Sequence, residues 1–196
     1  MLLTDLNANQ VEFGEIIVDA ERAQFKAAAK TDWFFPPDGS TRLTNVPYLG
    51  LLVAEPVFHF SAKVEVSFKS PYDGAALFVR THDDQWGKIA FEYSPQANPT
   101  IVSVVTRGTS DDSDGPQPST NTVFLRAYRH HSTFAFHFSE DGKYWKFLRW
   151  FSLSQNEPRE VELGIGCQSP TGAGCSAVVS DFRYVASAIP DLRNGH

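Results

Sequence analysis

The sequence predicts an all-β protein built as a sandwich of two antiparallel sheets. Three observations predict this class: apolar and polar residues alternate with a period of two, turn motifs separate short runs, and aromatic residues make up 13% of the chain. Sixteen of the aromatic residues are Phe, and aromatic and β-branched side chains favour strands. The length of 196 residues suits one sizeable core, so residues 1–196 are predicted to form a single domain.

The alternation identifies individual strands and the faces that they bury. The clearest strand covers 58–68, where every even-numbered residue is apolar and every odd-numbered one is polar. The same period predicts two further sets of inward side chains: Phe134, Phe136 and Phe138 in one strand, and Val161, Leu163, Ile165 and Cys167 in another. Residues 20–30 are the only helix candidate, and they fit a strand almost as well.

Turn signals divide the rest of the chain into short strands. They lie at Ser70–Gly74, Thr81–Asp84, Ser94–Pro99 and Ser139–Gly142. Strands that are joined by such short turns are antiparallel, and about twelve of them exceed one twisted sheet, which favours two packed sheets. The long polar stretch Gly108–Asn121 is predicted to be a surface loop, and loops of this length are often functional.

Composition excludes several classes of partner. A net charge of −6 argues against nucleic acid, because phosphate binding needs a basic surface. No apolar run approaches the roughly 18 residues that span a membrane, and the first ten residues lack the features of a signal peptide. We therefore expect a cytoplasmic protein that does not bind membranes. In that setting Cys167 and Cys175 are predicted to be free thiols.

Several motifs resemble a family of unknown function. They are Tyr72–Arg80, Trp86–Tyr93, Ser103–Asp111, Phe138–Trp145 and Gly164–Gly174, and together the resemblance covers Asp32–Tyr184. The resemblance implies a concanavalin A-like jelly roll, the architecture of lectins and glucanases. The family includes fungal proteins described as regulators of enolase, so the resemblance also implies a metabolic enzyme as a partner. Fold analogy by itself licenses no activity.

Catalytic motifs are not found in the sequence. A retaining glycosidase needs two carboxyl groups about 5–5.5 Å apart, and the glucanase pattern Glu-x-Asp-x-x-Glu does not occur. Glu160 and Glu162 are two apart but fit a solvated strand edge. Asp83-Asp84 and the acidic run 111–114 match no ordered calcium loop. We therefore predict neither catalysis nor a metal or cofactor.

A candidate binding surface follows from strand faces. If Leu77, Val79, Ile89, Phe91, Val102 and Val104 point inward, the outer face carries Arg80, Lys88, Glu92 and Arg107, with Trp86 at its rim and Trp33 as an alternative rim aromatic. Arg and Lys donate hydrogen bonds, Glu accepts them, and Trp offers a stacking surface. This set suits a polyol or a small anion. The alternative interpretation is an exposed sheet face with cross-strand ion pairs.

Two functions from different classes follow. The first is a non-catalytic binding module that holds a carbohydrate or a small polar metabolite on the outer face of one sheet. The alternative is a cytoplasmic interaction protein that regulates a metabolic, enolase-related enzyme. Saturable ligand binding by the isolated chain would favour the first, and co-purification with a protein would favour the second.

Overall fold

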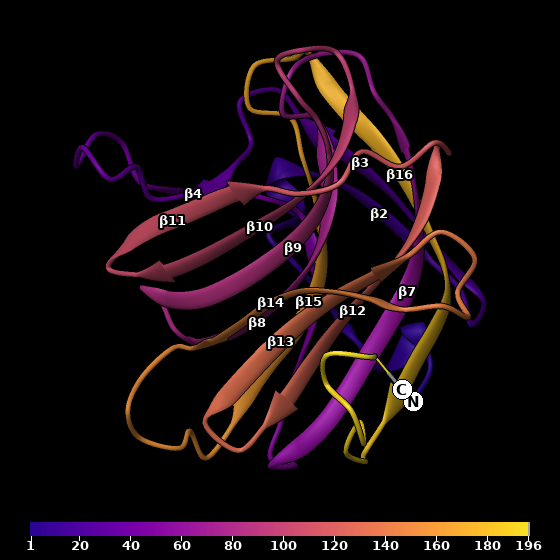
Figure 1. The fold of residues 1–196 in the computed structure, drawn as a ribbon. Coiled ribbons are helices and arrows are strands. Elements are labelled where there is room, and N and C mark those ends of the chain that lie inside the picture. Colours follow the sequence, from indigo (N-terminus) through magenta and orange to yellow (C-terminus); the bar gives the residue numbers. More distant parts are fainter. Residues whose placement is uncertain (196) are drawn as a thin grey trace.

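Two seven-stranded antiparallel sheets form the molecule in the computed structural model, which describes residues 1–195. Sheet A consists, in spatial order, of β1 (Asn7–Asn9), β6 (Tyr48–Val53), β15 (Val161–Gln168), β8 (Gly74–His82), β9 (Gln85–Tyr93), β10 (Pro99–Arg107) and β11 (Thr109–Asp114). Sheet B consists of β14 (Lys146–Ser152), β13 (Thr133–Ser139), β12 (Thr122–His130), β7 (Val57–Ser67), β16 (Gly174–Val185), β3 (Arg22–Ala28) and β2 (Gly14–Val18). The fold is therefore the predicted β-sandwich, as Figure 1 shows.

Smaller elements complete the described chain. β4 (Trp33–Phe34) and β5 (Leu43–Thr44) pair with each other, and two 3₁₀ helices, η1 (Leu3–Asp5) and η2 (Val11–Phe13), lie near the start. Within residues 1–195, no helix has the length and apolar character that a membrane crossing requires.

The main core lies between the inner faces of the two sheets. The alternation of residues 58–66 is confirmed, because every even-numbered side chain in that range belongs to this cluster. The predicted inward residues of β13 and β15 also belong to it, as do Leu77, Val79, Ile89 and Phe91. Cys167 and Cys175 are buried there as free cysteines, one from each sheet.

Two expectations about local structure are corrected or decided. The predicted loop Gly108–Asn121 contains the edge strand β11, which pairs with β10 from Val102↔Asp114 to Arg107↔Thr109. The ambiguous stretch 20–30 contains β3, whose alternate residues are buried. Short polar side chains do not prevent β11 from forming at the edge of sheet A. An edge strand pairs on one side only, so its other side can face water.

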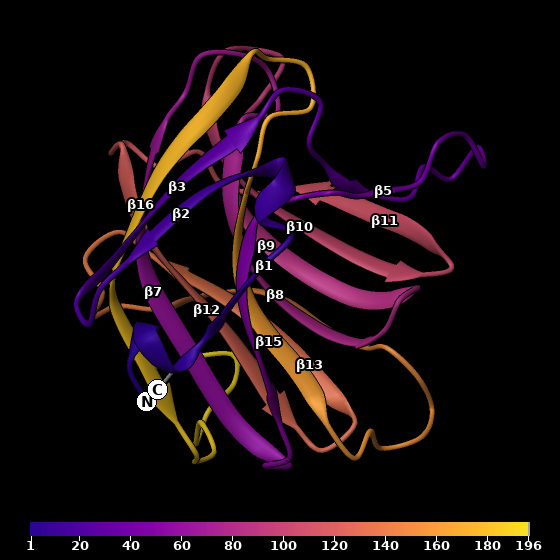
Figure 2. The same ribbon diagram turned by 180° about the vertical axis from the view of Figure 1, so that it is seen from behind.

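Residues 31–46, which we call the covering segment, lie across the outer face of sheet A. Backbone bonds join Thr31 to Ser169 at one end, and Phe35 and Ser110 exchange hydrogen bonds further along. Accordingly, β4 lies beside β11 in Figure 1, and β5 lies beside β11 in Figure 2. Trp33 and Phe35 form a second hydrophobic cluster on that face of the sheet.

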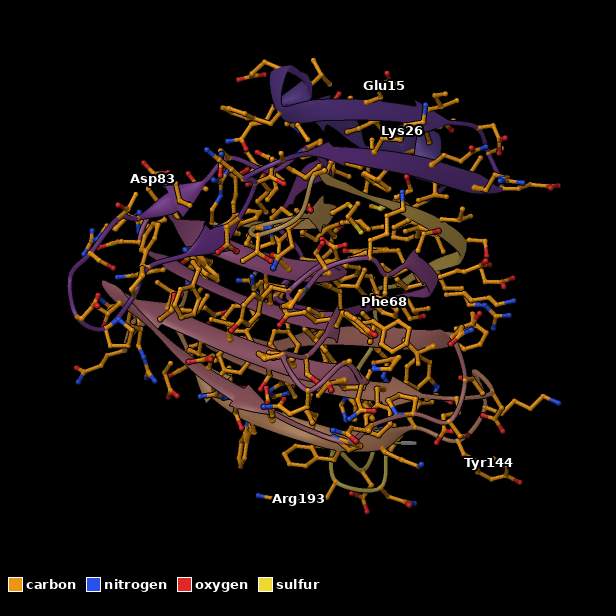
Figure 3. The ribbon with its side chains drawn as sticks, turned by 90° about the horizontal axis from the view of Figure 1, so that it is seen from above. Glu15, Lys26, Phe68, Asp83, Tyr144 and Arg193 are labelled. Carbon is orange, nitrogen blue, oxygen red and sulfur yellow. The ribbon has the colours of Figure 1, made fainter. Side chains whose placement is uncertain are left out.

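Figure 3 shows the side chains of the molecule from above. The ion pair of Glu15 and Lys26 lies at one margin, and Tyr144 and Arg193 lie at the opposite one. Phe68 packs instead on Phe91, edge to face at 5.0 Å between ring centroids.

Candidate functional site

A pocket of about 480 Å³ lies on the outer face of sheet A, at one side of the covering segment. Its lining residues come from the covering segment, the β9, β10, β11 and β15 strands and the loops beside them: Asp32, Phe34, Tyr72, Lys88, Glu92, Ser94, Pro95, Gln96, Val102, Val104, Asp112, Asp114, Gln168, Pro170 and Thr171. This volume falls in the range of about 300–1,000 Å³ that is usual for small-molecule sites. We call it the acidic pocket, because four of these residues are carboxylic acids.

Strand register explains how the lining residues come together. Directly opposed residues of an antiparallel pair point to the same face, so one row across the sheet contains Lys88, Val104 and Asp112. A second row contains Ala90, Val102 and Asp114. Within these rows the two valines supply an apolar floor between polar side chains.

Lys88 is a buried cation at the floor of the pocket. Its side chain is only 3% exposed, and Nζ donates to the Trp33 carbonyl and to Gln168 Oε1, each at 2.8 Å. The nearest carboxylate oxygen is Asp32 Oδ1 at 3.9 Å. Burying an ammonium is costly unless hydrogen bonds and opposite charge compensate it, and these contacts supply both. Lys88 therefore ties the covering segment and β15 to β9.

Glu92 lies on the same face of β9 as Lys88, four positions further along the strand, and is 8% exposed. Gln168 Nε2 donates to its Oε2 at 3.4 Å. Burial raises the pKa of Glu92 to about 7, with Asp32, Asp114 and Asp112 adding to the rise while Lys88 opposes it. Near neutral pH, the carboxyl is therefore divided between its protonated and ionised forms.

Gly74 leaves room for the contact between Gln168 and Glu92. It lies between them in the register, paired with Gln168 on one side and Glu92 on the other. A Cβ at this position would come within 2.9 Å of the Phe91 carbonyl oxygen and 3.2 Å of Glu92 Cα. A side chain there would displace backbone, so the small residue keeps this part of the face open.

Tyr72 contributes a ring at the edge of the pocket from a strained turn. Its φ of 69° lies in the left-handed region, which is uncommon for a residue other than glycine. The turn is held by Asp73, whose buried carboxylate accepts hydrogen bonds from the backbone of Lys69 and Ser70 and from the Ser169 hydroxyl. The side chain of Tyr72 remains exposed.

Both predicted rim aromatics, Trp86 and Trp33, are buried instead of lying at a rim. Trp86 is 0% exposed and Trp33 is also buried, and both belong to the hydrophobic cluster between the covering segment and sheet A. Their ring centroids are 5.6 Å apart. Trp86 does point to the predicted face, but the covering segment closes over it. Neither ring is available for stacking on a ligand.

The prediction that Arg107 lies on the outer face of the sheet is wrong as well. Val102 and Val104 share the outer face with Lys88, whereas Val105 belongs to the main core, so Arg107 projects to the face opposite Lys88. The physical reason is that β10 is apolar on both faces, because the covering segment and sheet B bury one side each. Alternation therefore gives no basis for choosing between the two registers of this strand.

Arg80 lies on the predicted face but outside the acidic pocket. Its Nε donates to Glu162 Oε2 at 2.7 Å, and a second nitrogen donates to the Tyr48 hydroxyl. It lines a different surface hollow with Leu52 and His82. Of the six predicted binding residues, only Lys88 and Glu92 therefore line the acidic pocket.

Most of the other polar lining residues are not among the predicted site residues. Asp112 and Asp114 lie in the predicted loop Gly108–Asn121, although their spacing of two fits one face of a strand. The alternation that places Cys167 inward also places the next residue, Gln168, on the outer face. Extending that pattern by one position therefore identifies Gln168. Asp32 has no comparable signal, since only the path of the covering segment brings it to the pocket.

The pKa of Glu92 makes a prediction about stability. A folded-state pKa of about 7, above the ordinary 4.5, means that the folded protein binds the extra proton between these values. The contribution of Glu92 is then fully present below about pH 4.5 and is lost as pH rises through 7. Glu92→Gln should remove this loss, which amounts to at most about 3 kcal/mol, an upper bound from the two pKa values.

Chemical denaturation at several pH values checks this prediction. The free energy of unfolding should fall more between about pH 5 and pH 8 in the unsubstituted protein than in the Glu92→Gln variant. Glu65→Gln, at an exposed position on β7, is the matched control and should leave the pH dependence unchanged. Parallel pH profiles for the protein and for Glu92→Gln would contradict the prediction.

Comparison with known proteins agrees with the sandwich of two sheets, which is the architecture of concanavalin-like proteins. The chain belongs to DUF1349, a family described as a protein of unknown function, whose model matches residues 14–187. Comparison with curated protein sequences finds no match.

Three solved structures illustrate the similarity of fold. A functionally unknown protein from Saccharomyces cerevisiae is 21% identical, with 96% of this chain and 100% of that chain covered and a TM-score of 0.87. A xylan β-1,4-xylosidase from Bacillus halodurans C-125 is 13% identical, with 90% and 38% covered and a TM-score of 0.67. Lectin I-B4 from Griffonia simplicifolia is 13% identical, with 93% of each chain covered and a TM-score of 0.59. These likenesses concern the fold alone.

Proposed function

We propose that this protein is a carbohydrate-binding module whose acidic pocket holds a single sugar ring or a similar polyol. The observation that carries the proposal is the combination of an apolar floor with hydrogen-bond acceptors around it. Val102 and Val104 form the floor, and Glu92, Asp112 and Asp114 supply carboxylate oxygens. A sugar ring has hydroxyl donors at its edge and C–H groups on its faces, so it matches both parts of this surface.

The aromatic side chains at the pocket support the same ligand class. Phe34 and Tyr72 both line the pocket, and Tyr72 is exposed. An aromatic ring packs well against the C–H face of a sugar, and large rings contribute much of the contact area in binding sites. The rings also explain why a purely ionic ligand is a poorer match, since it would leave the apolar part of the surface uncovered.

Methyl-resolved NMR titration with neutral oligosaccharides tests the proposal. Addition of gluco-, xylo-, manno- and galacto-oligosaccharides should produce saturable shifts at the Val102 and Val104 methyl groups for at least one series. The methyl groups of Val179, which lies in the main core, should not move. An isolated chain that binds none of these sugars but co-purifies with a metabolic enzyme would contradict the proposal and favour the interaction-protein alternative.

Tyr72→Gly should weaken binding of the sugar found in this way about tenfold, the equivalent of about 1.4 kcal/mol of lost ring contact. Glycine suits the left-handed backbone at this position, so the fold should be retained. Tyr144→Gly is the matched control, because Tyr144 is 72% exposed and does not line the pocket. Equal dissociation constants for both variants and the unsubstituted protein would place the ligand elsewhere.

A further inference from the structure

The charged side chains of the acidic pocket are strongly unbalanced. Asp32, Glu92, Asp112 and Asp114 contribute four carboxyl groups, and Lys88 contributes the one ammonium among the lining residues. With every carboxyl ionised, the lining carries a net charge of about −3, and protonation of Glu92 reduces this to about −2. A ligand therefore meets an excess of negative charge.

Lys88 does not offset this excess for a ligand. Two of its three donors are used by the Trp33 carbonyl and by Gln168, and its charge faces Asp32. It is almost completely buried, so a ligand cannot surround it. Its structural contacts explain its presence, and an anionic ligand would have to compete with them.

Asp112 and Asp114 are charged groups that lack internal partners. Within residues 1–195 the structure gives neither carboxylate a hydrogen bond or an ion pair. Asp111 is different, because it points away from the pocket and pairs with Arg149 at 2.8 Å. The same edge strand thus carries one neutralised carboxylate on one side and two unneutralised ones on the pocket side.

Glu92 provides an independent sign that a partner is missing. It is more than nine-tenths buried and lines the pocket, yet its only described hydrogen bond is the 3.4 Å contact from Gln168 to Oε2. In the part of the chain that the structure describes, Oε1 has no donor. A ligand donor inside the pocket would give this oxygen the hydrogen bond that the described residues do not supply.

We propose that the acidic pocket selects its ligand by charge, binding a sugar that carries a protonated amino group in preference to the same sugar without it, and rejecting the sugar acid. This inference rests on the proposed function, since it names which sugars that pocket takes. An ammonium supplies three donors, which suits a lining dominated by acceptors. A carboxylate on the ligand would add a like charge and bring no donor.

Matched sugars test this selectivity. Each of the gluco, galacto and manno series supplies the parent hexose, its 2-amino-2-deoxy form and its uronic acid, and calorimetry at about pH 6.5 keeps the amine mainly protonated. In at least one series we expect the amino sugar to bind about tenfold more tightly than the parent, equivalent to about 1.4 kcal/mol. The preference should shrink in about 0.5 M salt, because salt screens exposed charges.

Variants of β11 assign the preference to particular carboxylates. Asp112→Asn with Asp114→Asn should weaken binding of both sugars, because both carboxylates belong to the proposed site, but it should weaken the amino sugar more, so that its preference over the parent hexose falls to about twofold or less. Asp111→Asn is the charge-matched control on the same strand and should retain the full preference, because its carboxylate lies on the other side.

The outcomes separate this inference from the proposed function. Equal binding of parent and amino sugar, or tighter binding of the uronic acid, with shifts at Val102 and Val104, would overturn charge selectivity and leave sugar binding intact. An unchanged preference in the doubly substituted protein would also overturn it. No binding by any member of the three series would overturn charge selectivity, and if none of the four oligosaccharide series shifts the Val102 and Val104 methyl groups, the proposed function is overturned as well.

Discussion

Replacing Trp86 by alanine should lower the free energy of unfolding by about 3–5 kcal/mol, the usual cost of truncating a large buried aromatic side chain. Trp86 has no exposed surface. It contacts Trp33 and packs edge to face with Phe35 at 5.7 Å between ring centroids. Both neighbours belong to the covering segment, so the substitution leaves a cavity at the surface where that segment attaches to sheet A. Urea denaturation of the two proteins measures the difference.

Two further variants make the Trp86 prediction specific. Trp86→Phe keeps much of the ring and removes Nε1, which has no hydrogen-bond partner within residues 1–195, so its loss should be less than half that of alanine. Trp150→Ala is the matched control, since Trp150 is 57% exposed, and it should change stability by about 1 kcal/mol or less. A loss below 1 kcal/mol for Trp86→Ala would mean that this cluster does not hold the covering segment.

The inner faces of the sandwich could be predicted because only one side of those strands is apolar. In β7, Phe58 and Phe60 enter the core, while His59 between them lies on the other face. A one-residue shift would bury the polar set, so the pattern fixes the register. The same reasoning placed Lys88 and Glu92 on the correct face of β9.

The outer face of sheet A could not be predicted in the same way, because its burial depends on a distant part of the chain. The covering segment places Trp33 over Phe78, with ring centroids 4.2 Å apart, although 44 positions separate them in the sequence. Alternation reports that Phe78 points outward, but it carries no information on what lies above it. The error for β10 has the same origin: a strand buried on both faces loses its alternation, and Arg107 was assigned to the wrong side.

The acidic residues of β11 illustrate a third limit. Asp112 and Asp114 occur in a polar run without apolar residues on either face, which is typical of a loop. Pairing with β10 nevertheless makes this run an edge strand, and the pairing directs both side chains to the pocket. Charged residues are common on edge strands because they oppose pairing with another chain. Asp112 and Asp114 can therefore be interpreted either as residues that protect the sheet edge or as residues of the binding site.

Replacing Lys88 by methionine should cost about 3–5 kcal/mol, the range for removing one member of a buried, hydrogen-bonded charged group. Methionine has a similar length and fits the apolar surroundings, so the loss comes from the acceptors that remain. The Trp33 carbonyl and Gln168 Oε1 lose their donor. Rotation of the Gln168 amide could pair one acceptor anew, but Glu92 would then lose its contact with Nε2. One buried acceptor is left without a donor in either arrangement.

The loss should depend on pH, because Lys88 also lowers the pKa of Glu92. Without the ammonium, the ionised form of Glu92 is less favourable, so Lys88→Met should be more destabilising at about pH 8 than at about pH 5. Adding Glu92→Gln should recover part of the stability at the higher pH, and the double-mutant cycle measures the coupling between the two residues. Lys143→Met, at an exposed turn, is the control and should change stability by about 0.5 kcal/mol or less at either pH. A Lys88→Met variant as stable as this control would show that the ammonium is free to bind ligand, which would remove the reason for excluding anionic sugars.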